Sequence, residues 1–126
     1  MKEEIKQRRL AVLEETVQFY SADPSRRAKT GTGCHYITND GRRCAIGRLV
    51  DEDLACRLEK FHSGAGVGGH EIFEELPQEI KDLGLLFLAR LQNWHDDGQN
   101  WHDGLTEGGK NEAENLKRQV EIGDFI

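Results

Sequence analysis

Residues 77–97 constrain the fold more than any other stretch of this sequence. Pro77 suits the first position of a helix, and Asp97-Gly98 is typical of a place where a helix ends or bends. Apolar side chains recur at three- and four-residue spacing and then spread beyond one face, a pattern typical of a helix with neighbours on several sides. We therefore expect one long central helix. Its apolar positions are Ile80, Leu83, Leu85, Leu86, Phe87, Leu88, Leu91 and Trp94/His95.

Helical periodicity recurs in residues 5–22, 51–62 and 106–121, and a short element is expected at 70–76. Pro24 stops the first helix, and Asp23-Pro24-Ser25 predicts one further short turn with an aspartate cap. The apolar positions expected to face inward are Leu10, Leu13, Val17, Tyr20, Leu54, Leu58, Phe61, Ala113, Leu116 and Val120, whereas Cys56 lies off its helix's apolar stripe.

Residues 34–49 predict a β-hairpin around Asp40-Gly41, because this dipeptide between two strand-like runs is a strong hairpin signal. A two-residue turn would pair Ile37 with Cys44, and a three-residue turn with Gly41 as a bulge would pair Tyr36 with Cys44. Both registers stay open. A lone hairpin is marginally stable and must lie on helices or gain another strand. The fold class expected is α+β: a mostly helical single domain over residues 1–126, with one β-hairpin packed on about four helices.

Charge is distributed unevenly along the chain. The formal net charge is −6, yet the segment from Pro24 to Val50 holds six basic residues and one acid. A net acidic chain is unsuited to binding a nucleic-acid polymer, whereas a local basic segment can attract phosphate or an acidic partner. Guanidinium groups suit phosphate oxygens, so the candidate phosphate contacts are Arg26, Arg27, Arg42, Arg43 and Arg48.

Several classes of protein are disfavoured by what the chain lacks. No apolar run approaches the roughly 20 residues of a membrane span, and the N-terminus has no apolar core of a signal peptide. The three cysteines include no Cys-x-x-Cys pair and do not suggest a disulfide framework. We therefore expect a protein of the cytoplasm that does not bind membranes.

A direct repeat near the C-terminus is the most unusual motif. Gln92-Asn93-Trp94-His95-Asp96 recurs as Gln99-Asn100-Trp101-His102-Asp103, and Gly98 could turn the chain to bring the copies together. The indoles could stack on a base, a histidine beside an aspartate suits acid–base work, and both could contribute to a metal site. A polar helix end with one half-buried histidine is the structural alternative. The candidate ligand contacts here are Trp94, His95, Asp96 and Trp101, with Tyr36 as another stacking side chain.

Three other patterns are weaker. Gly64, Gly66 and Gly69 match Gly-x-Gly-x-x-Gly, but this loop follows a helix and not the strand that a dinucleotide site requires. Cys34, His35 and Cys44 could join a remote histidine at zinc, although their spacing is not that of a zinc knuckle. Cys44 with His95 and Asp96 could form a nucleophilic triad assembled in space. These three patterns do not predict a bound metal or cofactor, and we expect neither.

The run from Gly33 to Tyr36, followed by Asp40-Gly41-Arg42-Arg43-Cys44-Ala45-Ile46-Gly47-Arg48-Leu49, resembles short uncharacterised proteins of tailed-phage genomes. The later Leu91-Gln92 and His95-Asp96 resemble theirs as well. The resemblance covers about half of the chain and carries no established activity. It implies a phage or prophage accessory protein that acts in the host bacterial cytoplasm, where such proteins often inhibit host defence, sometimes by sequestering signalling nucleotides.

Together these patterns favour a binding protein without turnover that holds a small phosphorylated ligand, plausibly a nucleotide. One alternative is a hydrolase of a nucleotide or phosphorylated substrate that uses His95 and Asp96, with Cys44 as a further candidate. Another is an inhibitor whose acidic surface occupies the basic groove of a partner protein. A homo-oligomer is compatible with each, and the candidate residues could then converge between subunits.

Overall fold

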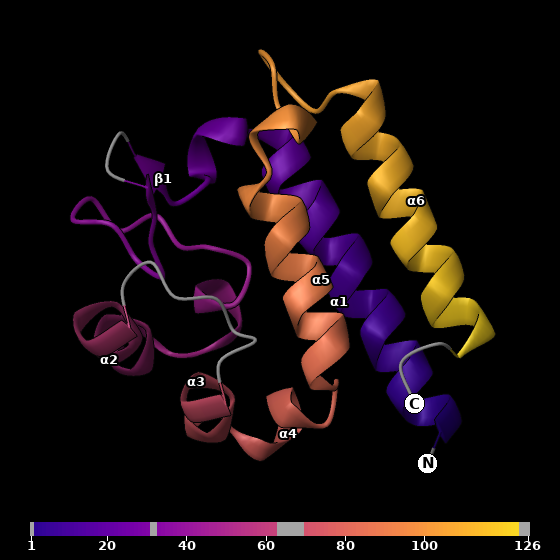
Figure 1. Ribbon diagram of the computed structural model, residues 1–126, viewed down its shortest axis with the longest axis horizontal. Coiled ribbons are helices and arrows are strands. Elements are labelled where there is room, and N and C mark those ends of the chain that lie inside the picture. Colours follow the sequence, from indigo (N-terminus) through magenta and orange to yellow (C-terminus); the bar gives the residue numbers. More distant parts are fainter. Residues whose placement is uncertain (1, 31–32, 63–69, 124–126) are drawn as a thin grey trace.

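The computed structural model describes residues 2–30, 33–62 and 70–123, and these residues are mostly helical (Figure 1). The expectation of a mostly helical fold is therefore confirmed. None of the described helices is long and apolar enough to cross a membrane. The elements in chain order are α1 (Lys2–Ala22), η1 (Pro24–Arg26), β1 (Lys29–Thr30), β2 (Gly33–Cys34), η2 (Gly47–Leu49), α2 (Glu52–His62), α3 (His70–Glu75), α4 (Gln78–Lys81), α5 (Leu85–Asp96), η3 (Gly98–Asn100) and α6 (Glu107–Ile122).

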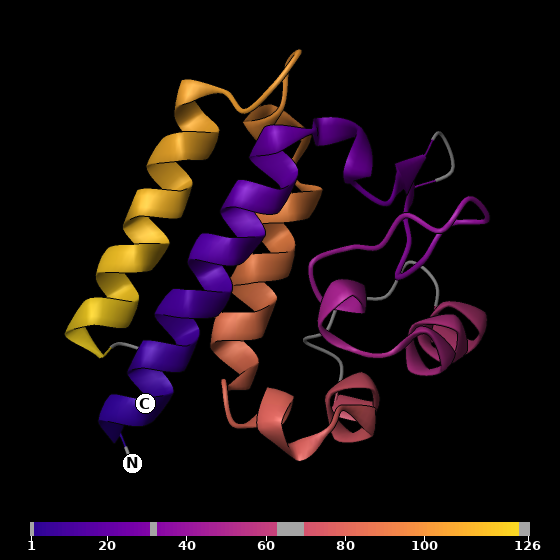
Figure 2. The ribbon, with the colours of Figure 1, turned by 180° about the vertical axis from the view of Figure 1, so that it is seen from behind.

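The helices α1, α5 and α6 form a bundle in which α6 runs antiparallel to the other two (Figures 1 and 2). Each helix contributes fully or almost fully buried side chains, as its apolar periodicity predicts. The cap expected at Asp23 is present, because Asp23 Oδ1 accepts Ser25 N at 3.1 Å. Two further caps form where Asp51 Oδ1 accepts Leu54 N at 2.8 Å and Thr106 Oγ1 accepts Gly109 N at 3.0 Å. The bundle core includes Leu13, Tyr20, Phe87, Leu88, Leu91, Leu116 and Val120.

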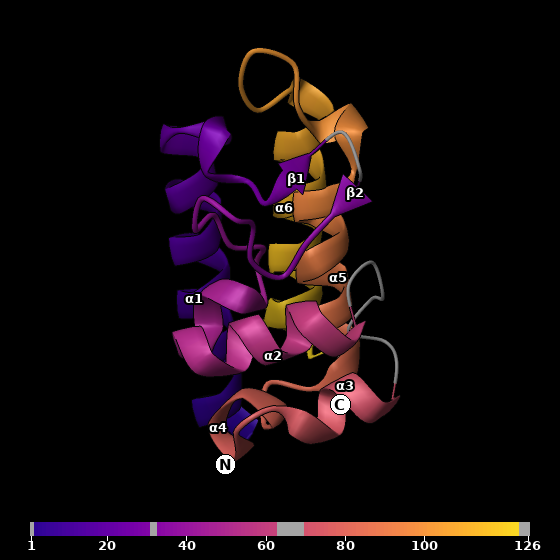
Figure 3. The same ribbon diagram turned by 90° about the vertical axis from the view of Figure 1, so that its left-hand side faces the viewer.

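A second layer, formed by residues 24–30 and 33–51 and the short helices α2, α3 and α4, covers one side of the bundle. Figure 3 shows β1 and β2 above α2, in front of the bundle helices. The side chains of Cys44, Ala45 and Ile46 are buried between this layer and α5, where Ile46 N donates to Gln92 Oε1 at 3.1 Å. This layer holds the cleft described below.

The single long helix expected over 77–97 is wrong, because the chain breaks between α4 and α5. Gly84 has φ +92°, a conformation that only glycine adopts readily, and it cannot belong to a right-handed helix. Leu86 is 63% exposed, so the stripe is also narrower than the sequence suggests. The inward position expected for Phe61 is likewise wrong, since Phe61 is 65% exposed although Leu58 in the same helix is buried.

The predicted α+β hairpin sheet of residues 34–49 is not formed. Across the turn there is one isolated bridge, Ile37 with Arg43, and the only paired strands among the described residues are the two-residue segments β1 and β2. Cys44 N donates to Tyr36 O at 3.2 Å, which is the three-residue register, and Gly41 has the positive φ of +87° that this turn requires. The turn prediction thus succeeds locally. The described residues are therefore mostly helical, with only the two-residue strands β1 and β2.

Candidate functional site

Three polar side chains from three different elements form a hydrogen-bonded row. Thr30 Oγ1 lies 2.9 Å from His35 Nε2, and His35 Nδ1 lies 2.8 Å from Glu59 Oε2. Thr30 ends β1, His35 follows β2, and Glu59 lies in α2. The order of groups is hydroxyl, imidazole and carboxylate, which is the arrangement by which hydrolases activate a hydroxyl.

The local backbone places this row. The pairing of Lys29 with Cys34 continues into a hydrogen bond from His35 N to Ala28 O at 2.9 Å, which sets His35 beside the end of β1. Glu59 is fixed at both oxygens, because its Oε1 accepts Tyr36 N at 2.7 Å while Oε2 faces the imidazole. A carboxylate at Nδ1 favours the tautomer with a proton on that nitrogen, which leaves Nε2 as an acceptor for a hydroxyl proton.

This row lines an open cleft of about 460 Å³. The cleft wall is completed by the turn around Asp40 and by Arg42, whose side chain is 32% exposed. Arg42 Nε lies 3.1 Å from each carboxylate oxygen of Asp40. Hydrogen bonds from Thr38 and Arg42 hold the pKa of Asp40 below its usual range, so Asp40 is ionised at neutral pH. The lining residues are Thr30, His35, Ile37, Thr38, Asn39, Asp40, Arg42 and Glu59.

Two of the five predicted arginines lie together at α1, beside the ring of Phe19. The guanidinium carbons of Arg26 and Arg48 are 4.6 Å and 5.3 Å from the centroid of this ring. Arg48 also donates to Glu15 Oε1 at 2.6 Å and to Thr16 Oγ1 at 2.7 Å. These contacts attach the basic segment to α1.

Two further arginines bind main-chain carbonyls. Arg43 donates to Val50 O at 3.1 Å, and Arg27 donates to His95 O at 2.9 Å. Arg42 is the predicted arginine that lines the cleft, and its Nη1 also donates to Arg27 O at 3.0 Å. The five guanidinium groups are therefore spread along the basic segment and do not surround one point.

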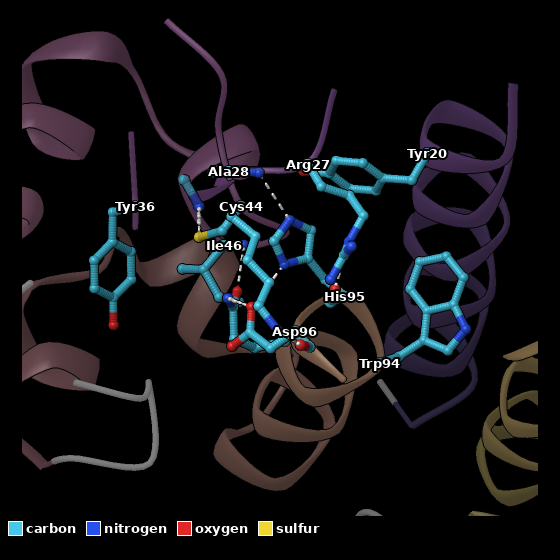
Figure 4. Close-up of polar contacts among 12 residues, drawn as sticks. Tyr20, Arg27, Ala28, Tyr36, Cys44, Ile46, Trp94, His95 and Asp96 are labelled. Atoms are coloured by element: carbon cyan, nitrogen blue, oxygen red, sulfur yellow. Dashed lines mark hydrogen bonds and ion pairs between the residues drawn. The ribbon is translucent and has the colours of Figure 1, made fainter. Parts of the chain in front are cut away.

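His95 lies in a buried polar cluster at the end of α5 (Figure 4). Its Nε2 accepts the main-chain N–H of Ala28 at 3.3 Å, and its Nδ1 lies 2.7 Å from Asp96 Oδ1. The edge of its ring meets the ring of Tyr20 at a centroid distance of 4.8 Å. Burial lowers the pKa of His95, although Asp96 opposes this shift, and the imidazole is neutral at neutral pH. In this arrangement His95 joins α5 to the residue that precedes β1 and is closed to solvent.

Cys44 occupies the same buried region. Its Sγ accepts Gly47 N at 3.2 Å, and burial raises the pKa of its thiol to about 12. Tyr36, another predicted ligand contact, is also buried, and burial raises the pKa of its phenol. Cys44 is therefore a thiol at neutral pH, without the thiolate character that a nucleophile requires.

The two copies of the repeat adopt different structures. Trp94 is buried in α5 and donates to Gly109 O at 2.9 Å, whereas Trp101 is half-buried after η3 and donates to His95 O at 3.2 Å. The two indoles meet edge to face at 5.2 Å. The side chain of His102 is 86% exposed, in contrast to buried His95. The repeat thus folds back on itself at Gly98, and its copies pack against each other.

Metal binding has little support within residues 2–30, 33–62 and 70–123. No group of three or more His, Cys, Asp or Glu side chains among them is placed to hold a metal ion. His35, one of the predicted zinc ligands, instead contacts Thr30 and Glu59. The glycine motif at Gly64, Gly66 and Gly69 lies outside the described residues.

The sequence did not reveal Thr30 and Glu59, and it suggested His35 only as a zinc ligand. Glu59 lies 24 residues from His35 along the chain, on the polar side of a helix where glutamate is common. The useful local signal was a threonine and a histidine on either side of a tight connection. Comparison with known proteins found no matching family model, no matching curated protein and no matching solved structure.

Proposed function

We propose that this chain binds a small phosphorylated ligand, plausibly a nucleotide, in the cleft beside Arg42. The observation that carries the proposal is the cleft itself, which combines one half-exposed guanidinium with hydroxyl, amide and imidazole groups. Its volume of about 460 Å³ is in the range of small-molecule sites, which extends from about 300 to 1,000 Å³. Phosphate oxygens are the acceptors that a guanidinium fork and neutral donors suit best.

Arg42 already binds one anion of this chain. The carboxylate of Asp40 contacts its Nε, and the Asp40 side chain is 65% exposed. Solvent screens an exposed ion pair of this kind and makes it weak, so a phosphate can exchange with the carboxylate. Thr38 and Asn39, on the same turn, line the cleft and supply further donors.

In the proposed biological role, the protein is a phage accessory protein that holds a host signalling nucleotide in the bacterial cytoplasm without hydrolysing its phosphate groups. The resemblance of the Gly33–Leu49 region to phage proteins and the basic segment of residues 24–50 support this role. The proposed partners include neither a nucleic-acid polymer nor a membrane. A homo-oligomer is compatible with this role.

Isothermal titration against a panel of mono-, di-, tri- and cyclic nucleotides tests the proposal. We expect at least one member to bind, and Arg42→Gln to weaken that binding about tenfold or more, because a charge-assisted hydrogen bond is lost. Arg26→Gln is the matched control, since Arg26 is exposed over Phe19 and does not line the cleft. Binding weaker than about 1 mM for every member, or an equal loss in both variants, would contradict the proposal.

A further inference from the structure

We propose that Thr30, His35 and Glu59 form a catalytic triad that hydrolyses a carboxylic ester, with Thr30 as the nucleophile. The phosphate expected on this ester rests on the proposed function, whereas the triad rests on its own geometry. Both hydrogen bonds of the row, 2.9 Å and 2.8 Å, lie within the reach of about 2.6–3.2 Å that nucleophile, base and orienting group require. The row also lines the cleft, so a substrate has access to it.

The three groups have separate roles. Thr30 Oγ1 is the nucleophile, and His35 Nε2 is the base that accepts its proton. Glu59 is the positioning residue, because both of its oxygens bind groups of this chain: Oε2 faces His35 Nδ1 and Oε1 accepts Tyr36 N. A carboxylate held at both oxygens keeps the imidazole ring in one orientation and stabilises the imidazolium that forms during attack.

The reaction proceeds in two balanced steps. Thr30 Oγ1 attacks the ester carbonyl carbon, its proton passes to His35 Nε2, and the alcohol leaves with that proton, so that an acyl ester remains on Thr30. Water then attacks the acyl carbon and gives one proton to His35 Nε2, which returns it to Thr30 Oγ1 as the carboxylic acid leaves. Asn39 lines the same cleft with a side-chain amide that can donate to the developing oxyanion.

The charges of the cleft favour acyl transfer over phosphoryl transfer. Phosphoryl transfer relies on several cationic groups around the transferred phosphate. The cleft lining contains one arginine, which Asp40 already contacts, and a second carboxylate in Glu59. A single arginine suffices to hold a phosphate that does not react. The substrate class is therefore a small carboxylic ester that carries a phosphate for Arg42.

The test uses 4-nitrophenyl acetate, which needs no phosphate, and follows both 4-nitrophenolate release and acetylation of the intact protein by mass spectrometry. We expect peptide mapping to place the acetyl group on Thr30. Thr30→Val keeps the shape of the side chain and should lower the rate about 100-fold or more, whereas Thr30→Ser keeps the hydroxyl and should retain activity. Glu59→Gln should lower kcat with little change in KM, and Glu59→Asp should restore part of kcat.

His62→Gln is the matched control for His35→Gln. His62 Nε2 lies 2.6 Å from Glu75 Oε2, so it is a second half-buried imidazole–carboxylate pair, outside the cleft lining. His35→Gln should abolish acetylation and His62→Gln should not. Equal activity in Thr30→Val and wild type, acetyl groups only on lysine or histidine, or equal losses in the two histidine variants would each overturn the triad. Thermal melting of each variant shows whether it folds. If a histidine variant does not fold, the comparison of Thr30→Val with Thr30→Ser decides whether the triad is catalytic.

The same proteins separate the triad from the proposed function. Nucleotide binding without acetylation of Thr30 would overturn the triad and leave the phosphate site standing. Acetylation of Thr30 without nucleotide binding would support the triad and overturn the phosphate ligand. The failure of both would return the Thr30–His35–Glu59 row to a structural role that joins β1 to α2.

Discussion

The guanidinium of Arg27 lies over the indole ring of Trp101, with its central carbon 4.8 Å from the ring centroid. Both side chains also donate to the same acceptor, the main-chain oxygen of His95, at 2.9 Å for Arg27 Nε and 3.2 Å for Trp101 Nε1. This oxygen lies at the C-terminal end of α5, where a positive charge is favourable. Arg27 therefore connects the basic segment to the helix bundle.

Arg27→Gln should lower the free energy of unfolding by about 1–3 kcal/mol, because it removes a charge-assisted hydrogen bond and the cation–π contact. Urea denaturation followed by tryptophan fluorescence measures the change. Arg57→Gln is the control, since Arg57 is 64% exposed and pairs with Glu75, and it should change the free energy by less than about 1 kcal/mol. If the two variants have equal stability, Arg27 has no structural role, and a role in ligand binding becomes its better explanation.

Gly47→Ala should destabilise the protein by about 1–3 kcal/mol or more, because a Cβ at Gly47 would overlap the main-chain oxygen of Tyr36. That oxygen also accepts Cys44 N, so the backbone around it cannot shift freely. Gly98→Ala is the matched control, since a Cβ there would meet only the flexible end of Lys29 at 3.6 Å. Differential scanning calorimetry should show a lower Tm for Gly47→Ala and little change for Gly98→Ala.

The helices follow from the sequence because their apolar periodicity and caps are local. Leu116 and Val120 are buried in α6 as their spacing predicts, and the cap at Asp23 forms as expected. The break at Gly84 was missed because an isolated glycine within an apolar run is compatible with a helix and with a sharp turn. Its φ of +92° lies next to a tertiary contact that the local sequence does not reveal, because Arg9 Nε of α1 donates to Leu83 O at 2.7 Å.

The candidate site was only partly predictable, for a related reason. Charge and the Asp40-Gly41 turn directed attention to Arg42, which lines the cleft. The partners of His35 are set by tertiary packing, since Glu59 approaches from α2 and no local spacing relates the two residues. His95 seemed reactive in sequence because it stands beside Asp96, but the sequence does not reveal that the core covers it.

Cys56 should react with a thiol reagent under native conditions much faster than Cys44. Cys56 is exposed, whereas Cys44 is 1% exposed and burial raises its thiol pKa to about 12. Alkylation with iodoacetamide at neutral pH, followed by peptide mapping, compares the two sites in one sample. In urea both cysteines should react alike, which provides the internal control. Rapid native alkylation of Cys44 would show that the core opens, and would revive Cys44 as a candidate nucleophile.

His95 should make the protein less stable in mild acid. Burial lowers the pKa of this imidazole in the folded state below the ordinary histidine value of 6.5, so the unfolded chain binds a proton more readily. The contribution is therefore complete above pH 6.5, and stability falls as the pH drops from 6.5 towards the lowered folded-state pKa.

Urea denaturation at several pH values between 5 and 8 should show a loss of at most about 1.4 kcal/mol per pH unit from this residue. His95→Gln should lose this part of the pH dependence, whatever its own stability. His102→Gln, which removes an exposed imidazole from the second copy of the repeat, is the control. A pH dependence that His95→Gln leaves unchanged would show that the His95 imidazole does not become protonated more easily on unfolding.

Asp40→Asn should strengthen the binding of inorganic phosphate to the cleft. The carboxylate of Asp40 is ionised and contacts Arg42 Nε. An incoming anion must therefore displace this carboxylate and also overcome the repulsion from its negative charge. An asparagine keeps the size of the side chain and removes both costs, for an expected gain of about three- to tenfold in affinity.

Asp103→Asn is the control because it removes the same charge from the chain at a side chain that is 96% exposed and outside the cleft. Phosphorus NMR titration at fixed ionic strength compares the two variants with wild type. An equal gain in both would assign the effect to net charge alone, and a weaker affinity in Asp40→Asn would show that Asp40 orients Arg42 for the anion and does not compete with it.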